Sequence, residues 1–272
     1  MKKFGLKLDC CEKVRSNGKE TDLFMNDFSS DTFFNDRLRI RQYKSGYRFS
    51  IDAIFLSYYA GLYGHDVVLD LGTGCGVIPL IMAYRNPKLR IYGVEVQKEL
   101  AEIAAFNVKD NQMADRIIIL CQDMVTLTKK DIPLPIDMVV CNPPYRKRAS
   151  GRINPNTQRA VARHEIQTDL SGILNTASRI LDISGRFITI YPAVRTAEIL
   201  SQMHASGLEP KFLRMIHSFH HSNSSFVLVE ARQGGNSGLT IGPPLFIYQN
   251  DGRYTEEIEN MFLPNPVEPE LN

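Results

Sequence analysis

The tetrapeptide Asn142-Pro143-Pro144-Tyr145 has the residue types needed to bind a planar amino group. The nitrogen of an exocyclic amine or a side-chain amide is a poor nucleophile because its lone pair is delocalised. The Asn142 amide oxygen and the Pro143 carbonyl oxygen can accept hydrogen bonds from such an NH2 group. Pro143 and Pro144 stiffen the loop by fixing φ, and Tyr145 offers a ring on which a planar base can stack. The motif predicts transfer of a group to an amino nitrogen, mainly by placement of the reacting atoms.

A second motif, Asp70-Leu71-Gly72-Thr73-Gly74-Cys75-Gly76, follows the apolar run at residues 67–69. Glycines at alternate positions allow a ligand to approach the backbone closely after a strand. A dinucleotide fingerprint would need Gly or Ala at position 77, where this chain has Val77. The motif therefore favours a nucleoside cofactor without a pyrophosphate, S-adenosylmethionine (SAM), over a nicotinamide cofactor.

Acidic residues follow the next two predicted strands. Glu95 ends the strand at residues 90–95, where a carboxylate can accept both ribose hydroxyls of the cofactor. Asp123 follows the strand at residues 117–121, and Met124 beside it offers backbone and apolar contact to the adenine ring. The predicted cofactor site comprises Asp70, Gly72, Thr73, Gly74, Gly76, Glu95, Val96, Asp123, Met124 and Asn142.

Apolar strand patterns and helical patterns alternate along most of the chain, which predicts a mostly parallel, doubly wound α/β sheet of the Rossmann type. The predicted strands are residues 67–71, 90–95, 117–121, 138–141 and 186–191. The predicted helices are residues 53–62, 77–84, 97–111, 170–181, 196–206 and 255–262, with a short one near Met124.

Further strand patterns flank this alternating core. Residues 38–43 alternate like a strand, and we expect residues 47–49 to pair back against them after a turn. Residues 212–218 and 225–231 follow each other without a helix, which predicts an antiparallel hairpin at one edge of the sheet. Residues 243–248 predict a short tail strand.

Composition limits the class of protein. The 272 residues can hold one large α/β domain with appendages, and we expect a partly disordered extension at residues 1–30 before a domain at residues 31–272. Five cysteines without a C-x-x-C pair indicate a reduced, intracellular protein with no structural zinc. No apolar run approaches the roughly 18 residues of a membrane span, and the basic N-terminus lacks the apolar region of a signal peptide. The expected compartment is the cytoplasm.

A basic segment directly follows the amine-binding motif. The net charge of +2 is near neutral, so affinity for nucleic acid must come from a local patch. Residues 146–167 form an irregular stretch longer than an ordinary connection, and such loops are usually functional or disordered. Clustered Arg and Lys bind phosphates. We therefore expect a nucleic-acid substrate contacted by Pro144, Arg146, Lys147, Arg148, Arg152 and Arg163; Arg159 is the remaining basic residue of the segment.

The two motifs, in this order and spacing, resemble class I SAM-dependent methyltransferases that modify amino nitrogens. Residues 46–53, 142–145 and 159–165, with the tail segments 243–248 and 252–255, resemble more narrowly the bacterial tRNA adenine-N6 methyltransferases. That family methylates the adenine beside the anticodon of a valine tRNA. The resemblance covers about residues 33–262.

The resemblance implies an enzyme that methylates N6 of adenine in tRNA and converts SAM to S-adenosylhomocysteine. It implies a class I sheet that ends in an antiparallel pair. Asn142, Pro143 and Tyr145 would lie at the reacting amine, Asp123 at the adenine amine of the cofactor and Asp70 at its methionine end. Phe49, Ser50 and Asp52 would close the methionine end of the pocket.

Other functions remain open at this point. The same chemistry could act on glutamine N5 of a protein, guanine N2 of rRNA or adenine in DNA. An enzyme that methylates a protein substrate would need no long basic segment. An enzyme that acts on DNA usually has a separate recognition domain. A non-catalytic protein that binds SAM or RNA would not need the intact Asn-Pro-Pro-Tyr motif. An NAD-dependent dehydrogenase is disfavoured by Val77. The oligomeric state and the role of residues 1–30 have no signature in the sequence.

Overall fold

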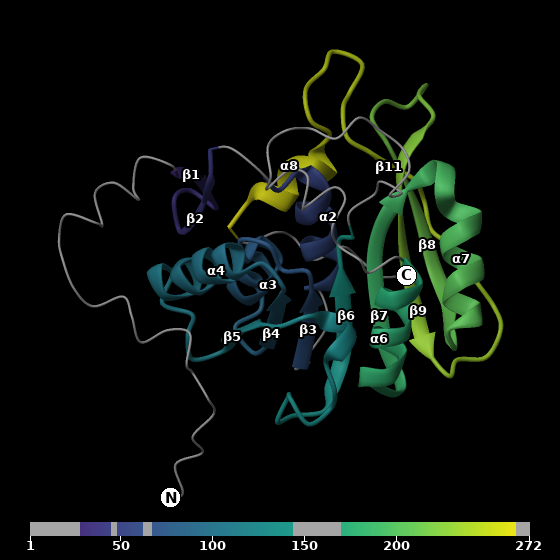
Figure 1. Cartoon of the computed structure of the whole chain (residues 1–272). Helices are drawn as coiled ribbons and strands as arrows, with labels where there is room; N and C mark the ends of the chain where they lie inside the picture. Colours follow the sequence, from purple (N-terminus) through teal and green to yellow (C-terminus); the bar gives the residue numbers. More distant parts are fainter. Residues whose placement is uncertain (1–27, 45–47, 62–66, 144–169, 265–272) are drawn as a thin grey trace, which may run out of the picture.

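A nine-stranded mixed sheet forms the centre of the molecule (Figure 1). The computed structural model describes residues 28–44, 48–61, 67–143 and 170–264. The strand order is β10-β8-β9-β7-β6-β3-β4-β5, and β11 also pairs with β8. The parallel part comprises β3 (Val67–Leu71), β4 (Arg90–Glu95), β5 (Ile117–Cys121), β6 (Ile136–Cys141) and β7 (Leu181–Pro192). These strands are rich in Val, Ile and Leu because helices cover both of their faces.

The C-terminal half of the sheet changes direction. β9 (Ser224–Gln233) runs antiparallel to both of its neighbours, β7 and β8 (Leu208–His217). Two short strands, β10 (Thr240–Ile241) and β11 (Leu245–Phe246), pair with β8 and form the outer edge. The predicted α/β class, the antiparallel pair and the tail strand are confirmed, and the pair lies one step inside the edge.

Helices cover the two faces of the sheet in two groups. α2 (Ile51–Ala60), α3 (Val77–Arg85), α4 (Lys98–Asp110) and α8 (Glu256–Phe262) pack on one face, and α6 (Leu170–Ile180) and α7 (Thr196–Ala205) on the other. Two single turns, η1 (Met124–Thr126) and η3 (Ala193–Arg195), complete the helical segments described. On β3, Val68 belongs to the first apolar cluster and Leu69 to the second, as strand alternation requires.

A separate hairpin, β1 (Phe28–Phe33) and β2 (Leu38–Tyr43), packs beside α3 and α4. The predicted return pairing against β2 is wrong for residues 48 and 49, which form no strand, because β1 is the strand that pairs with β2 along its whole length. Residue 47 lies outside the described residues. The sequence of β1, Phe-Ser-Ser-Asp-Thr-Phe, has too little apolar alternation to predict a strand. β1 starts at Phe28, so strand structure begins within the predicted extension.

Candidate active site at the carboxyl edge of the sheet

Strand register brings the two motifs together. Leu71, the last residue of β3, pairs with Val94 of β4 on one side and with Cys141 of β6 on the other. Gly72 and Asn142 therefore leave neighbouring strands at the same level, roughly 5 Å apart in the sheet direction. Glu95 lies one residue beyond Val94 on β4. The carboxyl edge of the sheet thus collects the glycine turn, the acidic residue and the amine-binding motif, as expected for a doubly wound fold.

The glycine turn has a left-handed backbone conformation that residues with a Cβ rarely adopt. Gly72, Gly74 and Gly76 have φ values of 78°, 57° and 83°. The backbone N–H groups of Gly72 and Thr73 both donate to Val94 O, at 2.9 and 3.0 Å, which ties the turn to β4. A Cβ on Gly76 would lie 3.3 Å from the Ala104 Cβ, so this glycine also permits close packing of α4. The turn therefore has no side chains at its glycines and is held in place by β4 and α4.

Asp70 is fully buried at the end of β3. Neither of its carboxylate oxygens has a hydrogen-bond partner among the described residues, and the same holds for the Thr73 hydroxyl. Burial raises the pKa of Asp70 from 3.8 to about 7, the nearby Thr73 hydroxyl opposes this rise, and the Glu95 carboxylate adds to it. Such a group is costly unless a cation or donor reaches it.

Glu95 is buried but braced by the backbone. One carboxylate oxygen accepts from Gly74 N at 3.0 Å and the other from Gln97 N at 2.9 Å. Burial raises the pKa of Glu95, and these two donors act against the rise. Because each carboxylate oxygen has more than one acceptor direction, both can still accept a hydroxyl.

These features fit S-adenosylmethionine. The cofactor has a cationic sulfur and an ammonium group at its methionine end, which match the unpartnered Asp70 carboxylate. Its ribose hydroxyls match the fixed Glu95 carboxylate. The glycine turn follows Asp70 in the chain and contacts Glu95 through Gly74 N. The individual contacts remain predictions.

The predicted adenine end is built by the segment after β5. Asp123 is exposed and accepts from Val125 N at 2.9 Å, so one of its oxygens caps η1. Met124 is buried, and its Cε lies 3.7 Å from the position of a Cβ on Gly72. Val96 is about half exposed at the end of β4 (49%). Met124 thus lies beside the glycine turn, whereas a contact between Asp123 and adenine remains a prediction.

Asn142 and Pro143 follow β6 directly, and the strand end beneath them is held on both sides. The Thr189 hydroxyl donates to Cys141 O at 2.8 Å, and the Cys141 thiol donates to Leu71 O at 3.2 Å. Pro143 is buried and Asn142 is half-buried. Several predicted residues lie outside the described part of the chain: Pro144, Tyr145, Arg146, Lys147, Arg148, Arg152, Arg159 and Arg163.

The structure adds Asn107 on α4, a residue that the sequence patterns did not single out. Its buried side-chain amide donates to Cys75 O at 2.9 Å and to Arg41 O at 2.8 Å, and accepts from Arg41 N at 3.0 Å. Asn111, one turn later, makes the equivalent pair of bonds with Arg39. Each of the two amides bonds to the N–H and the carbonyl of one β2 residue, as a neighbouring strand would. Only Asn107 also bonds to the glycine turn. Two asparagines four residues apart on one helix are the available sequence signal.

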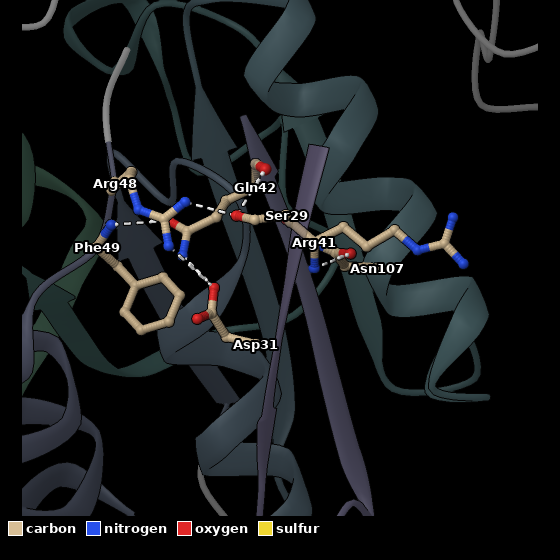
Figure 2. A network of polar contacts seen from close by, with 7 residues as sticks. All are labelled: Ser29, Asp31, Arg41, Gln42, Arg48, Phe49 and Asn107. Atoms are coloured by element: carbon tan, nitrogen blue, oxygen red, sulfur yellow. Dashed lines mark hydrogen bonds and ion pairs between the residues drawn. The ribbon is translucent and has the colours of Figure 1, made fainter. Parts of the chain in front are cut away.

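A polar network ties the segment before α2 to the same hairpin (Figure 2). Gln42 donates to Asp31 at 2.5 Å, Arg48 donates to Asp31 at 3.3 Å, and Phe49 N donates to Gln42 at 3.2 Å. Figure 2 shows Asn107 reaching Arg41 at the other side of the hairpin. The hairpin therefore connects Phe49 with the glycine turn.

The other two residues predicted to close the pocket lie at the start of α2, Ser50 at the N-cap position and Asp52 in the first turn. Ser50 donates to the buried Asp52 carboxylate, which also accepts from Ala53 N at 3.0 Å. Their contact with the cofactor stays a prediction.

The part of the chain that the structure describes holds no cluster of three or more His, Cys, Asp and Glu residues suited to a metal ion. In the same residues, no helix is both long and apolar enough to cross a membrane.

The strand order, the glycine turn with its two buried carboxylates and the motif after β6 define a class I methyltransferase, the class that uses S-adenosylmethionine. A predicted O-methyltransferase from Agrobacterium tumefaciens has the same fold, with a TM-score of 0.62 and 22% identity over 77% of this chain and 94% of that one. The chain belongs to the methyltransferase small domain family, whose model matches residues 61–202.

Curated relatives extend the match beyond that domain. A tRNA1(Val) (adenine(37)-N6)-methyltransferase from Porphyromonas gingivalis is 28% identical over 244 residues, which are 86% of this chain and 94% of the relative. The protein of the same name from Phocaeicola vulgatus is 30% identical over 191 residues, 70% of this chain and 76% of the relative. The family resemblance expected from the motifs is confirmed.

Proposed function

We propose that this chain transfers a methyl group from S-adenosylmethionine to N6 of an adenine in tRNA, at the position beside the anticodon. The observation that carries the proposal is the register of β3 and β6, in which Leu71 pairs with Cys141. This pairing sets Asn142 and Pro143 directly beside the glycine turn. The names of the relatives from Porphyromonas gingivalis and Phocaeicola vulgatus support the choice of tRNA and of adenine.

The amine is activated by acceptors rather than by a base. The cofactor supplies a methyl group on a positively charged sulfur. The Asn142 amide oxygen and the Pro143 carbonyl oxygen each accept a hydrogen bond from the adenine NH2 group. These hydrogen bonds shift the nitrogen toward tetrahedral geometry. The nitrogen bonds to the methyl carbon as the carbon–sulfur bond breaks, and the electron pair of that bond stays on sulfur. A proton then leaves the alkylated, now acidic nitrogen for water, so placement of the atoms is the main requirement.

The substrate must present its adenine outside a base stack to reach this edge. In this proposal Tyr145 stacks on the flipped base, and Arg146, Lys147, Arg148, Arg152 and Arg163 bind phosphates of the tRNA. Residues 31–272 act as the methyltransferase domain, with residues 1–30 as an extension. The reaction takes place in the cytoplasm, where tRNA is found.

The test is nucleoside mass spectrometry of tRNA from cells with and without the gene. We expect N6-methyladenosine at the position beside the anticodon of a valine tRNA to disappear without the gene. Purified protein and SAM should then restore it in vitro, and the Asn142→Ala variant should not. An unchanged methyladenosine content, or methyl groups found only in protein glutamine, rRNA or DNA, would contradict the proposed substrate.

A further inference from the structure

Two loops project from the carboxyl edge of the sheet beyond the strands that hold the active site. β7 is parallel to β6, while β9 is antiparallel to both β7 and β8, so β8 points the same way as β6. The loop after His217, which ends β8, therefore lies at the same edge as Asn142. Figure 1 shows this loop and the loop at residues 247–255, drawn in yellow before α8, at the top of the molecule.

The two loops are joined and internally fixed. Ile247 N donates to His217 O and Tyr248 N donates to Ser218 O, both at 2.9 Å. The loop at residues 247–255 is closed by its own backbone contacts. Gln249 N donates to Arg253 O at 2.8 Å, and Tyr248 and Tyr254 form an antiparallel β-bridge. Such closure means that little conformational freedom is lost when a ligand binds between the loops.

A hollow of about 490 Å³ lies between them. One part of its wall is aromatic: the His220 and Phe246 rings meet edge to face at 6.1 Å, and Tyr248 stacks on Tyr254 at 5.3 Å. The other part is polar, with the exposed side chains of Asn250 and Asp251 and the amide of Gln249. A planar ring with hydrogen-bonding edges matches both parts of this wall.

The charges indicate a base rather than a phosphate. Among the described residues that line the hollow, none is Lys or Arg. The nearby Arg253 guanidinium is held by Asp251, to which it donates at 2.8 Å. Both Asp251 carboxylate oxygens accept from Arg253, and each has a further acceptor direction that an amino or imino group of a base can use. A phosphate would face this carboxylate with no Lys or Arg in the lining.

The position suits a nucleotide close to the reacting one. β6 and β8 are three strand steps apart in the order β6-β7-β9-β8, and β11, which carries Phe246, pairs with the outer side of β8. At the usual strand spacing β8 and β11 lie about 14 and 19 Å from β6, a distance that a few nucleotides of an opened RNA loop can span.

We propose that the hollow between the β8–β9 loop and residues 246–255 binds an unstacked base of the same RNA, a few nucleotides from the methylated adenine. The base stacks on the His220 ring, contacts the Phe246 ring at its edge and accepts or donates hydrogen bonds with Asn250 and Asp251. This inference rests on the proposed RNA substrate and assigns to the C-terminal loops the choice of the site within that RNA.

The test uses anticodon stem-loop RNAs in which single loop positions are abasic. With the parent protein, one position other than the target should raise the KM by about 5- to 100-fold, as expected for loss of one stacked base. The His220→Ala/Asn250→Ala variant should show a similarly raised KM with the intact RNA and no further rise with that abasic RNA. Its SAM affinity and thermal stability should match the parent, and its salt dependence should be unchanged because no phosphate contact is lost.

Two matched variants sharpen the result. His220→Phe keeps the ring and should restore most of the affinity, while His204→Ala removes another exposed histidine at the end of α7 and should change nothing. The proposal is overturned if the double variant methylates intact RNA with the parent KM, or if no abasic position couples to it. Failure of the RNA function itself would be seen separately, as a parent protein that does not methylate the RNA.

Discussion

At the scale of single residues, Asp70 is a carboxyl group without solvent exposure and without a hydrogen-bond partner among the described residues. Its pKa is raised by burial to about 7, so the group changes charge near neutral pH in the free protein. A cationic ligand favours the ionised form, which couples cofactor binding to pH.

We expect the affinity for S-adenosylmethionine to increase as the pH rises from 5.5 to about 7 and to level off above it. If only the ionised carboxylate binds, the slope approaches about tenfold per pH unit. Asp70→Asn should bind more weakly at pH 8 and lose this dependence. Calorimetry across the pH range measures both proteins, and titration of the ligand itself remains in the variant as an internal control. Identical pH profiles for the two would refute the assigned role.

The same shift predicts an effect on stability. Because the folded-state pKa of Asp70 lies above its ordinary value of 3.8, its contribution to stability is present below pH 3.8 and is lost as the pH rises through about 7. Asp70→Asn should therefore raise the free energy of unfolding at pH 8, by at most about 4 kcal/mol at roughly 1.4 kcal/mol per unit. Urea titrations without cofactor should show the full gain at pH 8, less than half of it at pH 5 and little of it below pH 3.8. A variant less stable than the parent at pH 8 would contradict the burial argument.

At the scale of elements, the β1–β2 hairpin supports the glycine turn through α4. Asn107 replaces a strand partner for Arg41 and holds Cys75 O, whereas Asn111 bonds to Arg39 and does not touch the turn. Both residues hold the hairpin, and only Asn107 also holds the glycine turn. Substituting each of them therefore distinguishes an effect on hairpin packing from an effect on the glycine turn.

Asn107→Leu should lower stability by about 1–3 kcal/mol or more, since it leaves the buried Cys75 carbonyl without this donor and removes two part-buried hydrogen bonds with the Arg41 backbone. It should also raise the KM for S-adenosylmethionine while kcat changes less. Asn111→Leu should lower stability by a smaller amount and leave the KM near the parent value. Denaturant unfolding and steady-state kinetics of both variants provide the measurement. Equal effects of the two substitutions on the KM would rule out the positioning role of Asn107.

Elements with strong periodicity could be predicted from the sequence to within a few residues. β3 is apolar except for Asp70, and α4 has buried Leu100, Ile103 and Ala104 at helical spacing. β1 could not be predicted, because its polar residues belong to a hairpin whose inner contacts are made by β2. The partners of Asn107 lie up to 66 residues away in the sequence, so the residue type alone could not reveal them. Glu95 could be predicted because parallel register repeats the strand ends at one edge.

At the scale of the whole molecule, successive strand ends divide one edge of the sheet between different parts of the reaction. The ends of β3, β4 and β5 carry the residues predicted to bind the cofactor, Asn142 follows β6, and the hollow lies at the loops beyond β8 and β11. In the sequence, the basic segment at residues 146–163 directly follows the amine-binding motif. In this arrangement RNA backbone, target base and cofactor are bound by different segments.

Replacing Arg146, Lys147, Arg148 and Arg152 together by Ala should weaken tRNA binding and make it less dependent on salt. Loss of four phosphate contacts should reduce the slope of log affinity against log salt by about three to four units. Affinity for S-adenosylmethionine should not change. Lys130→Ala is the control, because Lys130 is exposed and precedes β6 at the opposite edge of the sheet. A parent-like salt slope in the fourfold variant would show that this segment does not contact the phosphates.

The central claim is that the strand end after β6 presents acceptors to the amine that is methylated. Single-turnover methylation of a tRNA pool by Asn142→Ala, with saturating S-adenosylmethionine, tests it most directly. We predict a rate lower by about 10²–10³-fold, the usual loss for one placed group in a transition state, with cofactor affinity nearly intact. Tyr145→Phe, which keeps the stacking ring, should retain most of the rate. Methyl transfer by Asn142→Ala at the parent rate would contradict the account.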